Sequence, residues 1–143
     1  MNREEYAKKI EDLFTSFFEK TLSDMLGGNP QFKDFTNCAF ITLQDDLLQA
    51  FVKSYNLYFN KAEMSELQSA EYDKALIYQM LYVLTEGDFR LISGYDLVTN
   101  SMINKSELEK RYISPMAKMT LTNAGLLYRA GSRETFIFWR RGF

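Results

Sequence analysis

The sequence predicts a mainly α-helical, single-domain protein, built as a helical bundle around one central apolar helix and completed by a C-terminal β-hairpin. Three observations lead to this prediction. The stretch 72–84 contains ten apolar or tyrosine residues among thirteen, the longest such run in the chain. Two amphipathic segments precede it, and a glycine-containing turn signal follows it. At 143 residues the chain is expected to form one domain, residues 1–143.

The apolar stretch predicts a helix over 70–86, because it is too long for an ordinary strand and rich in Leu, Met and Ala. Ser69 is its expected N-cap, and Gly87 is expected to end it. On a helical wheel the aliphatic side chains fill one broad face, and Tyr78 and Tyr82 lie opposite. A helix that is apolar on nearly all sides must be covered on nearly all sides, so it belongs at the centre of the domain.

Two long amphipathic helices are expected before this central helix. The first spans 3–26, with Asn2 as its N-cap and Gly27 at its end, and its buried stripe is rich in phenylalanine. The second spans 43–60, with Thr42 as its N-cap. Their apolar faces are expected to cover the aliphatic face of the central helix.

The segment 38–41, before the second helix, admits two interpretations: a buried strand or the lead into that helix. Cys38, the only cysteine, is best explained as a small buried hydrophobe, since the chain has no histidine to generate a thiolate. Asp45 and Asp46 are explained by the positive end of the helix dipole rather than by a metal. After the second helix, a short helical turn is expected at 63–67.

The C-terminal part is predicted to consist of shorter elements. Pro115 is expected to break or restart a helix, and Gly125 to end it. Gly131 and Ser132 form a two-residue turn signal between two apolar segments. The expected order is an extended piece at 89–92, a short helix at 94–100, a helix at 105–123 and the β-hairpin at 126–140.

Composition excludes several classes of chemistry. Without histidine, Ser–His–Asp and Cys–His catalysis are impossible, and the commonest metal ligand is missing. No glycine-rich phosphate loop occurs. The chain is therefore expected not to be an enzyme and to bind no cofactor or metal. No secretory signal or membrane-spanning run is found, which, with a single cysteine, predicts a soluble cytoplasmic protein.

Charge is unevenly distributed along the chain. Residues 1–104 carry nine Lys and Arg against sixteen Asp and Glu, whereas residues 105–143 carry eight against three. The domain is thus expected to combine an acidic helical part, 1–68, with a central-helix and basic C-terminal part, 69–143. Basic residues near the C-terminus favour contact with an anionic partner or with an acidic patch on another copy.

The main functional hypothesis is a non-enzymatic protein-interaction or assembly subunit. Such a chain could be a component of a structural oligomer, or a small inhibitor or adaptor that docks on a larger machine. It would bind a protein partner or form a homo-oligomer. Aromatic residues, which are abundant here, are favoured at protein interfaces. The candidate interface residues are Tyr78, Tyr82, Phe138 and Trp139.

An alternative hypothesis comes from element order. The sequence of helix, extended piece, two helices and hairpin in the C-terminal half resembles a winged helix, without a specific motif. That resemblance implies nucleic-acid binding by residues 105–141. The candidate contacts are the basic side chains Lys105, Lys110, Arg111, Lys118, Arg129, Arg133, Arg140 and Arg141.

Overall fold

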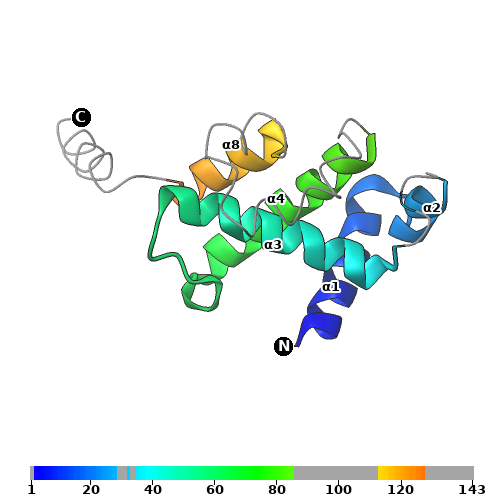
Figure 1. Cartoon of the computed structure of the whole chain (residues 1–143), viewed down its shortest axis with the longest axis horizontal. Coiled ribbons are helices and arrows are strands. Elements are labelled where there is room, and N and C mark those ends of the chain that lie inside the picture. The colour runs from blue at the N-terminus through cyan, green and yellow to red at the C-terminus, as the bar shows by residue number, and fades with distance from the viewer. Residues whose placement is uncertain (1, 29–31, 33–34, 86–112, 128–143) are drawn as a thin grey trace.

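The computed structural model describes residues 2–28, 32, 35–85 and 113–127. These residues form five α-helices and one short 3-10 helix, and the described part contains no strand (Figure 1). The mainly helical prediction is confirmed. The predicted elements at 89–92 and 94–100 and nearly all of the hairpin at 126–140 lie outside the described residues. The helices are α1 (Arg3–Phe18), α2 (Leu22–Gly27), α3 (Asn37–Tyr55), η2 (Lys61–Glu63), α4 (Glu66–Thr85) and α8 (Pro115–Asn123).

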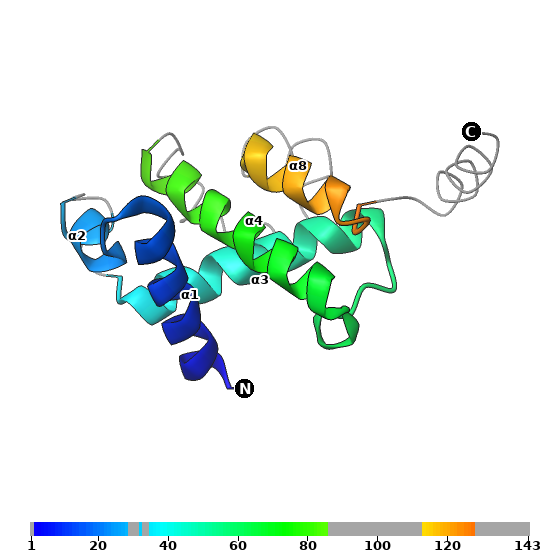
Figure 2. The ribbon, with the colours of Figure 1, turned by 180° about the vertical axis from the view of Figure 1, so that it is seen from behind.

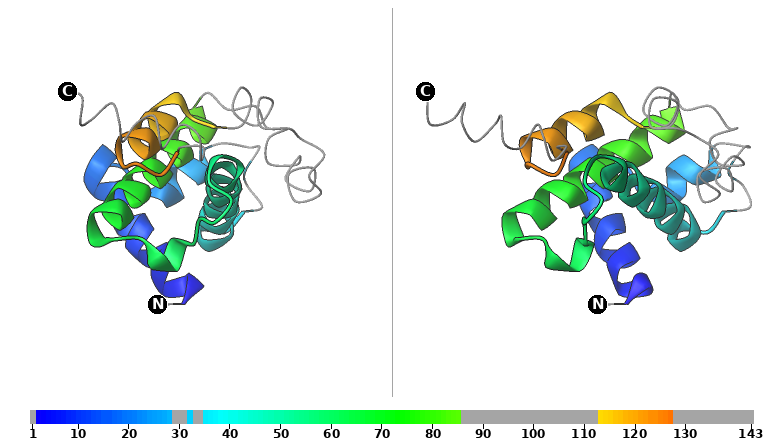
Figure 3. Two further views of the ribbon diagram at one scale, coloured as in Figure 1. Left: turned by 90° about the vertical axis from the view of Figure 1, so that its left-hand side faces the viewer. Right: turned by 60° about the vertical axis from the view of Figure 1, so that its left-hand side comes forward.

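Helix α4 holds the central position that the sequence predicts. It packs against α1, α3 and α8, and α1 also packs against α3 (Figures 2 and 3). The short α2 contacts α1 and α3. The predicted cover of the central helix by the two preceding long helices is therefore confirmed. On the opposite side of α4, Ala75 and Gln79 are also buried, whereas Tyr78 and Tyr82 are half-buried.

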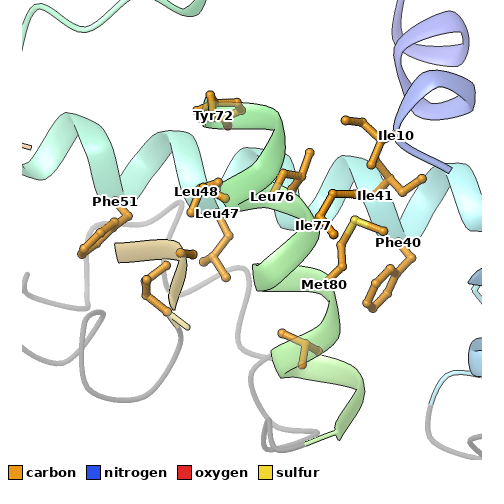
Figure 4. Packing of buried hydrophobic residues seen from close by; sticks show 14 of the residues in the cluster. Ile10, Phe40, Ile41, Leu47, Leu48, Phe51, Tyr72, Leu76, Ile77 and Met80 are labelled. Carbon is orange, nitrogen blue, oxygen red and sulfur yellow. The ribbon is translucent and has the colours of Figure 1, made fainter. Parts of the chain in front are cut away.

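The core is formed where α3 and α4 cross, with α1 closing one end (Figure 4). Full burial of one such aliphatic or aromatic side chain contributes on the order of 1.5–3 kcal/mol. Tyr72 contributes the ring of a tyrosine to this core and is itself completely buried. The labelled core residues are Ile10 of α1, Phe40, Ile41, Leu47, Leu48 and Phe51 of α3, and Tyr72, Leu76, Ile77 and Met80 of α4.

The prediction of one continuous helix over 3–26 is wrong, because the helix is interrupted at Glu19 and a second helix follows. Its start is confirmed: Asn2 Oδ1 accepts a 2.8 Å hydrogen bond from the Glu5 backbone N–H. Glu19, however, takes a left-handed φ of 58° and ends α1. Thr21 then caps α2 by accepting a 3.1 Å bond from the Asp24 N–H. The break redirects the chain so that Leu22 is buried in the same core as α1.

The second helix starts earlier and ends earlier than predicted. Thr36 is the N-cap, since its hydroxyl accepts a 3.0 Å bond from the Ala39 N–H, and Thr42 lies inside the helix. Residues 38–41 are thus helical, which selects one of the two interpretations, and Cys38 is half-buried against the core. At its other end α3 stops at Tyr55.

Helix α4 begins one turn before the predicted Ser69 cap. The Ser65 hydroxyl accepts from the Gln68 N–H at 3.1 Å, and Gln68 Oε1 accepts from the Ser65 N–H at 3.3 Å. This reciprocal arrangement is a capping box. The helical turn predicted at 63–67 is instead a 3-10 turn, η2, followed by the first turn of α4.

Helix α8 restarts at Pro115, as the sequence predicts. Ser114 caps it by accepting from the Ala117 N–H, and Pro115 occupies the first turn, where its missing N–H costs nothing. Gly125, with φ of 77°, ends the helix as predicted. The Gly125 N–H bonds to the Thr122 carbonyl, and the next N–H bonds to Leu121, which together form a Schellman motif.

Buried polar groups join α8 to the bundle. Gln79 Oε1 accepts a 2.8 Å bond from the Ser114 N–H, and Gln79 Nε2 donates a 3.2 Å bond to Gln44 Oε1 on α3. All three residues are buried. The Gln44 Nε2 group is buried without a hydrogen-bond partner within the described ranges. At the far end of α8, Gln68 Nε2 donates to the Ala124 carbonyl at 3.3 Å.

Candidate functional site

A cleft of about 850 Å³ opens between the start of α1, the C-terminal half of α3 and the loop that joins α3 to α4. This loop, residues 56–64, is called the α3–α4 loop below; it lies to the right of the N-terminus of α1 in Figure 2. Polar and apolar side chains both line the cleft. The lining residues are Asn2, Arg3, Tyr6, Asp45, Gln49, Lys53, Leu57, Tyr58, Phe59, Asn60, Lys61, Ala62 and Glu63.

The inner wall of the cleft is built around Asp45 of α3. Asp45 Oδ1 accepts a 2.6 Å hydrogen bond from the hydroxyl of the buried Tyr72. Both Asp45 oxygens accept 3.1 Å bonds from Lys61 Nζ. The side chains of Asp45 and Lys61 are only 15% and 25% exposed, so this ion pair is largely removed from water. One carboxylate therefore ties the α3–α4 loop to both α3 and α4.

A second carboxylate, Asp73 of α4, repeats this arrangement beside α1. The Tyr6 hydroxyl donates a 2.6 Å bond to Asp73 Oδ1, and Lys9 Nζ lies 3.0 Å from Asp73 Oδ2. Lys61 Nζ connects the two groups, since it lies 3.6 Å from the centre of the Tyr6 ring and 4.9 Å from that of Tyr72.

The two tyrosines in this cluster act as hydrogen-bond donors. Burial raises the pKa of Tyr6 above its ordinary value, and the negative charge of Asp73 raises it further. Burial likewise raises the pKa of Tyr72, with Asp45 as the main charged contributor. Both hydroxyls stay protonated at neutral pH and cannot serve as general bases there. Because each hydroxyl donor faces a carboxylate acceptor, the hydrogen bonds of the cluster are made within it, and they hold α1, α3, α4 and the α3–α4 loop together.

This cluster corrects the explanation of Asp45 and Asp46 from the helix dipole. Since α3 begins at Asn37, both aspartates lie in its middle rather than in its first turn. Asp45 is instead held by Tyr72 and Lys61. Asp46 lies 3.9 Å from Arg3 of α1.

The α3–α4 loop is held rigidly at its base. Phe59 is buried and stacks on the Tyr72 ring, with 6.3 Å between ring centres. Asn56 accepts bonds from the Tyr58 N–H through its side chain and from the Phe59 N–H through its carbonyl. Asn60 does the same for two N–H groups of η2. Such side-chain bonds to nearby backbone are typical of tight turns.

This rigid base presents two large side chains to solvent. Leu57 is 78% exposed and Tyr58 is 88% exposed, and both line the cleft. We call these two residues the rim pair. Because the backbone of the loop is already held by hydrogen bonds, binding through these side chains orders little additional backbone, which favours their use as anchors.

The structure describes three of the twelve site residues that the sequence suggested. Tyr78 and Tyr82 are half-buried and pack against the core, where the Tyr78 ring lies 6.3 Å from that of Phe17. Lys118 is half-buried on α8, whose exposed large apolar residues are Met116 and Met119. The remaining candidates lie outside the described residues: Phe138, Trp139, Lys105, Lys110, Arg111, Arg129, Arg133, Arg140 and Arg141.

The rim pair was missed because the sequence pattern assigns Tyr58 to the apolar stripe of a helix that extends to residue 60. The helix ends at Tyr55, so Tyr58 leaves that stripe and faces solvent. The signal that could have revealed this is the pair of turn-forming residues Asn56 and Asn60, which enclose the exposed segment.

The described ranges contain neither a metal-binding cluster nor a membrane-spanning helix. No group of three or more His, Cys, Asp and Glu residues there could hold a metal ion. No helix there is long and apolar enough to cross a bilayer.

Comparisons of the chain with protein-family models, with curated proteins and with solved structures yield no match.

Proposed function

We propose that this chain is a non-enzymatic protein-interaction or assembly subunit that engages its partner through the rim pair and the adjoining cleft. The observation that carries this proposal is the contrast between Leu57 and Tyr58, which are highly exposed, and their neighbour Phe59, which is buried. Exposed apolar residues are common singly. Two consecutive exposed side chains of this kind, on a loop held by hydrogen bonds beside a cleft, have the character of an interface anchor.

The surroundings of the rim pair support binding rather than catalysis. The half-buried Tyr6, which lines the cleft, and the buried Tyr72 behind it are protonated donors that already have acceptors. The carboxylates Asp45 and Asp73 are each paired with a lysine. These groups hold the loop, and no nucleophile with an adjacent base is found among the described residues that line the cleft.

The proposal is tested by affinity purification from the native host with three versions of the chain: wild type, the double variant Leu57→Ala/Tyr58→Ala, and Leu67→Ala. Leu67 is a matched control, because it is 81% exposed but lies on α4 and does not line the cleft. A partner bound at the rim is retained by the wild type and by Leu67→Ala, and is lost with the double variant. Equal retention by all three versions would refute the proposal.

The nucleic-acid alternative stays a prediction. It depends on residues 105–112 and 128–141, which lie outside the described ranges. The described part of its would-be reading helix is α8, in which Ala117, Thr120 and Leu121 are buried. The large side chains that α8 exposes are Met116 and Met119, so no described observation favours nucleic acid over protein.

A further inference from the structure

The charges around the cleft narrow the kind of partner that fits it. Lys61 and Asp45 neutralise one another in the inner wall. Nearer to solvent, Lys53 of α3 and Glu63 of η2 are both exposed and both line the cleft. Neither forms an ion pair with a described residue. Arg3, the other exposed cation of the lining, lies 3.9 Å from Asp46. Lys53 and Glu63 are therefore the charged lining residues without an ion-pair partner among the described residues, and both lie beside the rim pair.

Such a surface is complementary to itself. In a two-fold symmetric dimer the same patch meets its own copy, so that residue i contacts residue j and residue j contacts residue i. A patch with one cation and one anion then forms two opposite-charge contacts across the axis. The hollow next to the exposed Tyr58 is the other half of this complementarity, because each aromatic ring can enter the cleft of the opposite copy.

We infer that the occupant of the cleft is a second copy of this chain, arranged so that Tyr58 enters the opposite cleft and Lys53 faces Glu63 of the second copy. This inference rests on the proposed function, whose interaction site it uses. Electrostatic complementarity of this kind selects partner and orientation. The rim pair supplies the apolar anchor at the centre of the contact.

Charge exchange gives a direct test by analytical ultracentrifugation, with native mass spectrometry to distinguish the species. The wild type is expected to form a reversible dimer. Lys53→Glu alone and Glu63→Lys alone each place like charges opposite one another, so each variant is expected to be monomeric. An equimolar mixture of the two variants restores both opposite-charge contacts and is expected to form a heterodimer. Recovery of the dimer in the mixture also shows that both variants are folded.

Tyr58→Ala is expected to weaken dimerisation by roughly 30-fold or more, the effect of losing an interface hot spot. Leu67→Ala is expected to dimerise as the wild type does, and matching circular dichroism spectra check the folding of both variants. A wild type that stays monomeric at its highest soluble concentration would overturn the inference, as would a mixture of charge variants that stays monomeric.

The inference and the proposed function can fail separately. If the wild type is monomeric but retains a different host protein through Leu57 and Tyr58, the second-copy inference is wrong and the interaction site stands. If the wild type is monomeric and retention does not depend on these residues, both are wrong.

Discussion

Replacement of Asp45 by alanine should be one of the most damaging single changes on the cleft wall. It removes the acceptor of the 2.6 Å bond from the Tyr72 hydroxyl and both 3.1 Å bonds from Lys61. A hydrogen bond to a charged group contributes about 1.5–3 kcal/mol. Loss of the partly buried ion pair adds about 1 kcal/mol, discounted for the remaining solvent exposure of Lys61. The higher helix propensity of alanine offsets up to about 0.7 kcal/mol of this loss in stability.

The net expected loss in the free energy of unfolding is therefore about 2–3 kcal/mol. This loss is measured by urea denaturation, with helix content followed by circular dichroism at roughly 222 nm. Asp12→Ala is the matched control: it is the same substitution within a helix, but Asp12 is 70% exposed and pairs with Lys8 at 3.7 Å. That control should change stability by about 0.5 kcal/mol or less.

A double-mutant cycle with Tyr72→Phe separates the contributions to this loss. The two residues should show a coupling energy of about 1–2 kcal/mol, because the bond between the Tyr72 hydroxyl and the Asp45 carboxylate is lost in either single variant. The 3.2 Å bond from this hydroxyl to the Asp45 backbone carbonyl remains in Asp45→Ala. The reasoning would be refuted if Asp45→Ala cost less than about 1 kcal/mol, or if its effect and that of Tyr72→Phe were simply additive.

Three further outcomes are expected. Because the folded-state pKa values of Tyr6 and Tyr72 are raised above the unfolded value of about 10, their stabilisation is complete below that pH and declines above it, by about 1.4 kcal/mol per pH unit for each tyrosine. Tyr6→Phe should reduce this alkaline slope by one such increment in urea titrations, and an unchanged slope would exclude the role of Tyr6. Thr21→Ala, which deletes the cap of α2, should cost about 1 kcal/mol by the same assay, and a neutral result would show that the cap is dispensable. Leu76→Ala, at a completely buried position of α4, should cost about 2–5 kcal/mol and lower the melting temperature, whereas a loss below about 1 kcal/mol would contradict its place in the core.

The position of the central helix could be predicted from sequence because its signal is local. An apolar run that continues around the whole helix requires cover on every side, and α4 has it from α1, α3 and α8. The N-cap at Asn2 and the left-handed Gly125 were predictable for the same reason, since each depends on neighbours within a few positions. The break at Glu19 was not, because apolar residues continue at helical spacing on both sides of it.

The candidate site was harder to predict because its contacts span long stretches of sequence. Asp45 and Tyr72 are 27 residues apart, and Tyr6 and Asp73 are 67 apart. No local pattern indicates that these side chains meet. The exposure of Tyr58 likewise depends on where α3 ends, and helix ends are the least certain feature of a periodic pattern.

The buried amides between α3, α4 and α8 determine the register of α8. The small and aliphatic side chains of Ala117 and Leu121, which are buried on α8, carry no directional bond that would oppose a slide by one turn, about 5.4 Å, along α4. The same slide would break the hydrogen bond between Gln79 Oε1 and the Ser114 N–H and leave both groups buried and unpaired, which costs about 1–3 kcal/mol for each group. One alignment of α8 on α4 is thereby favoured over its neighbours, and it places the buried Ile113 beside the same amide contacts.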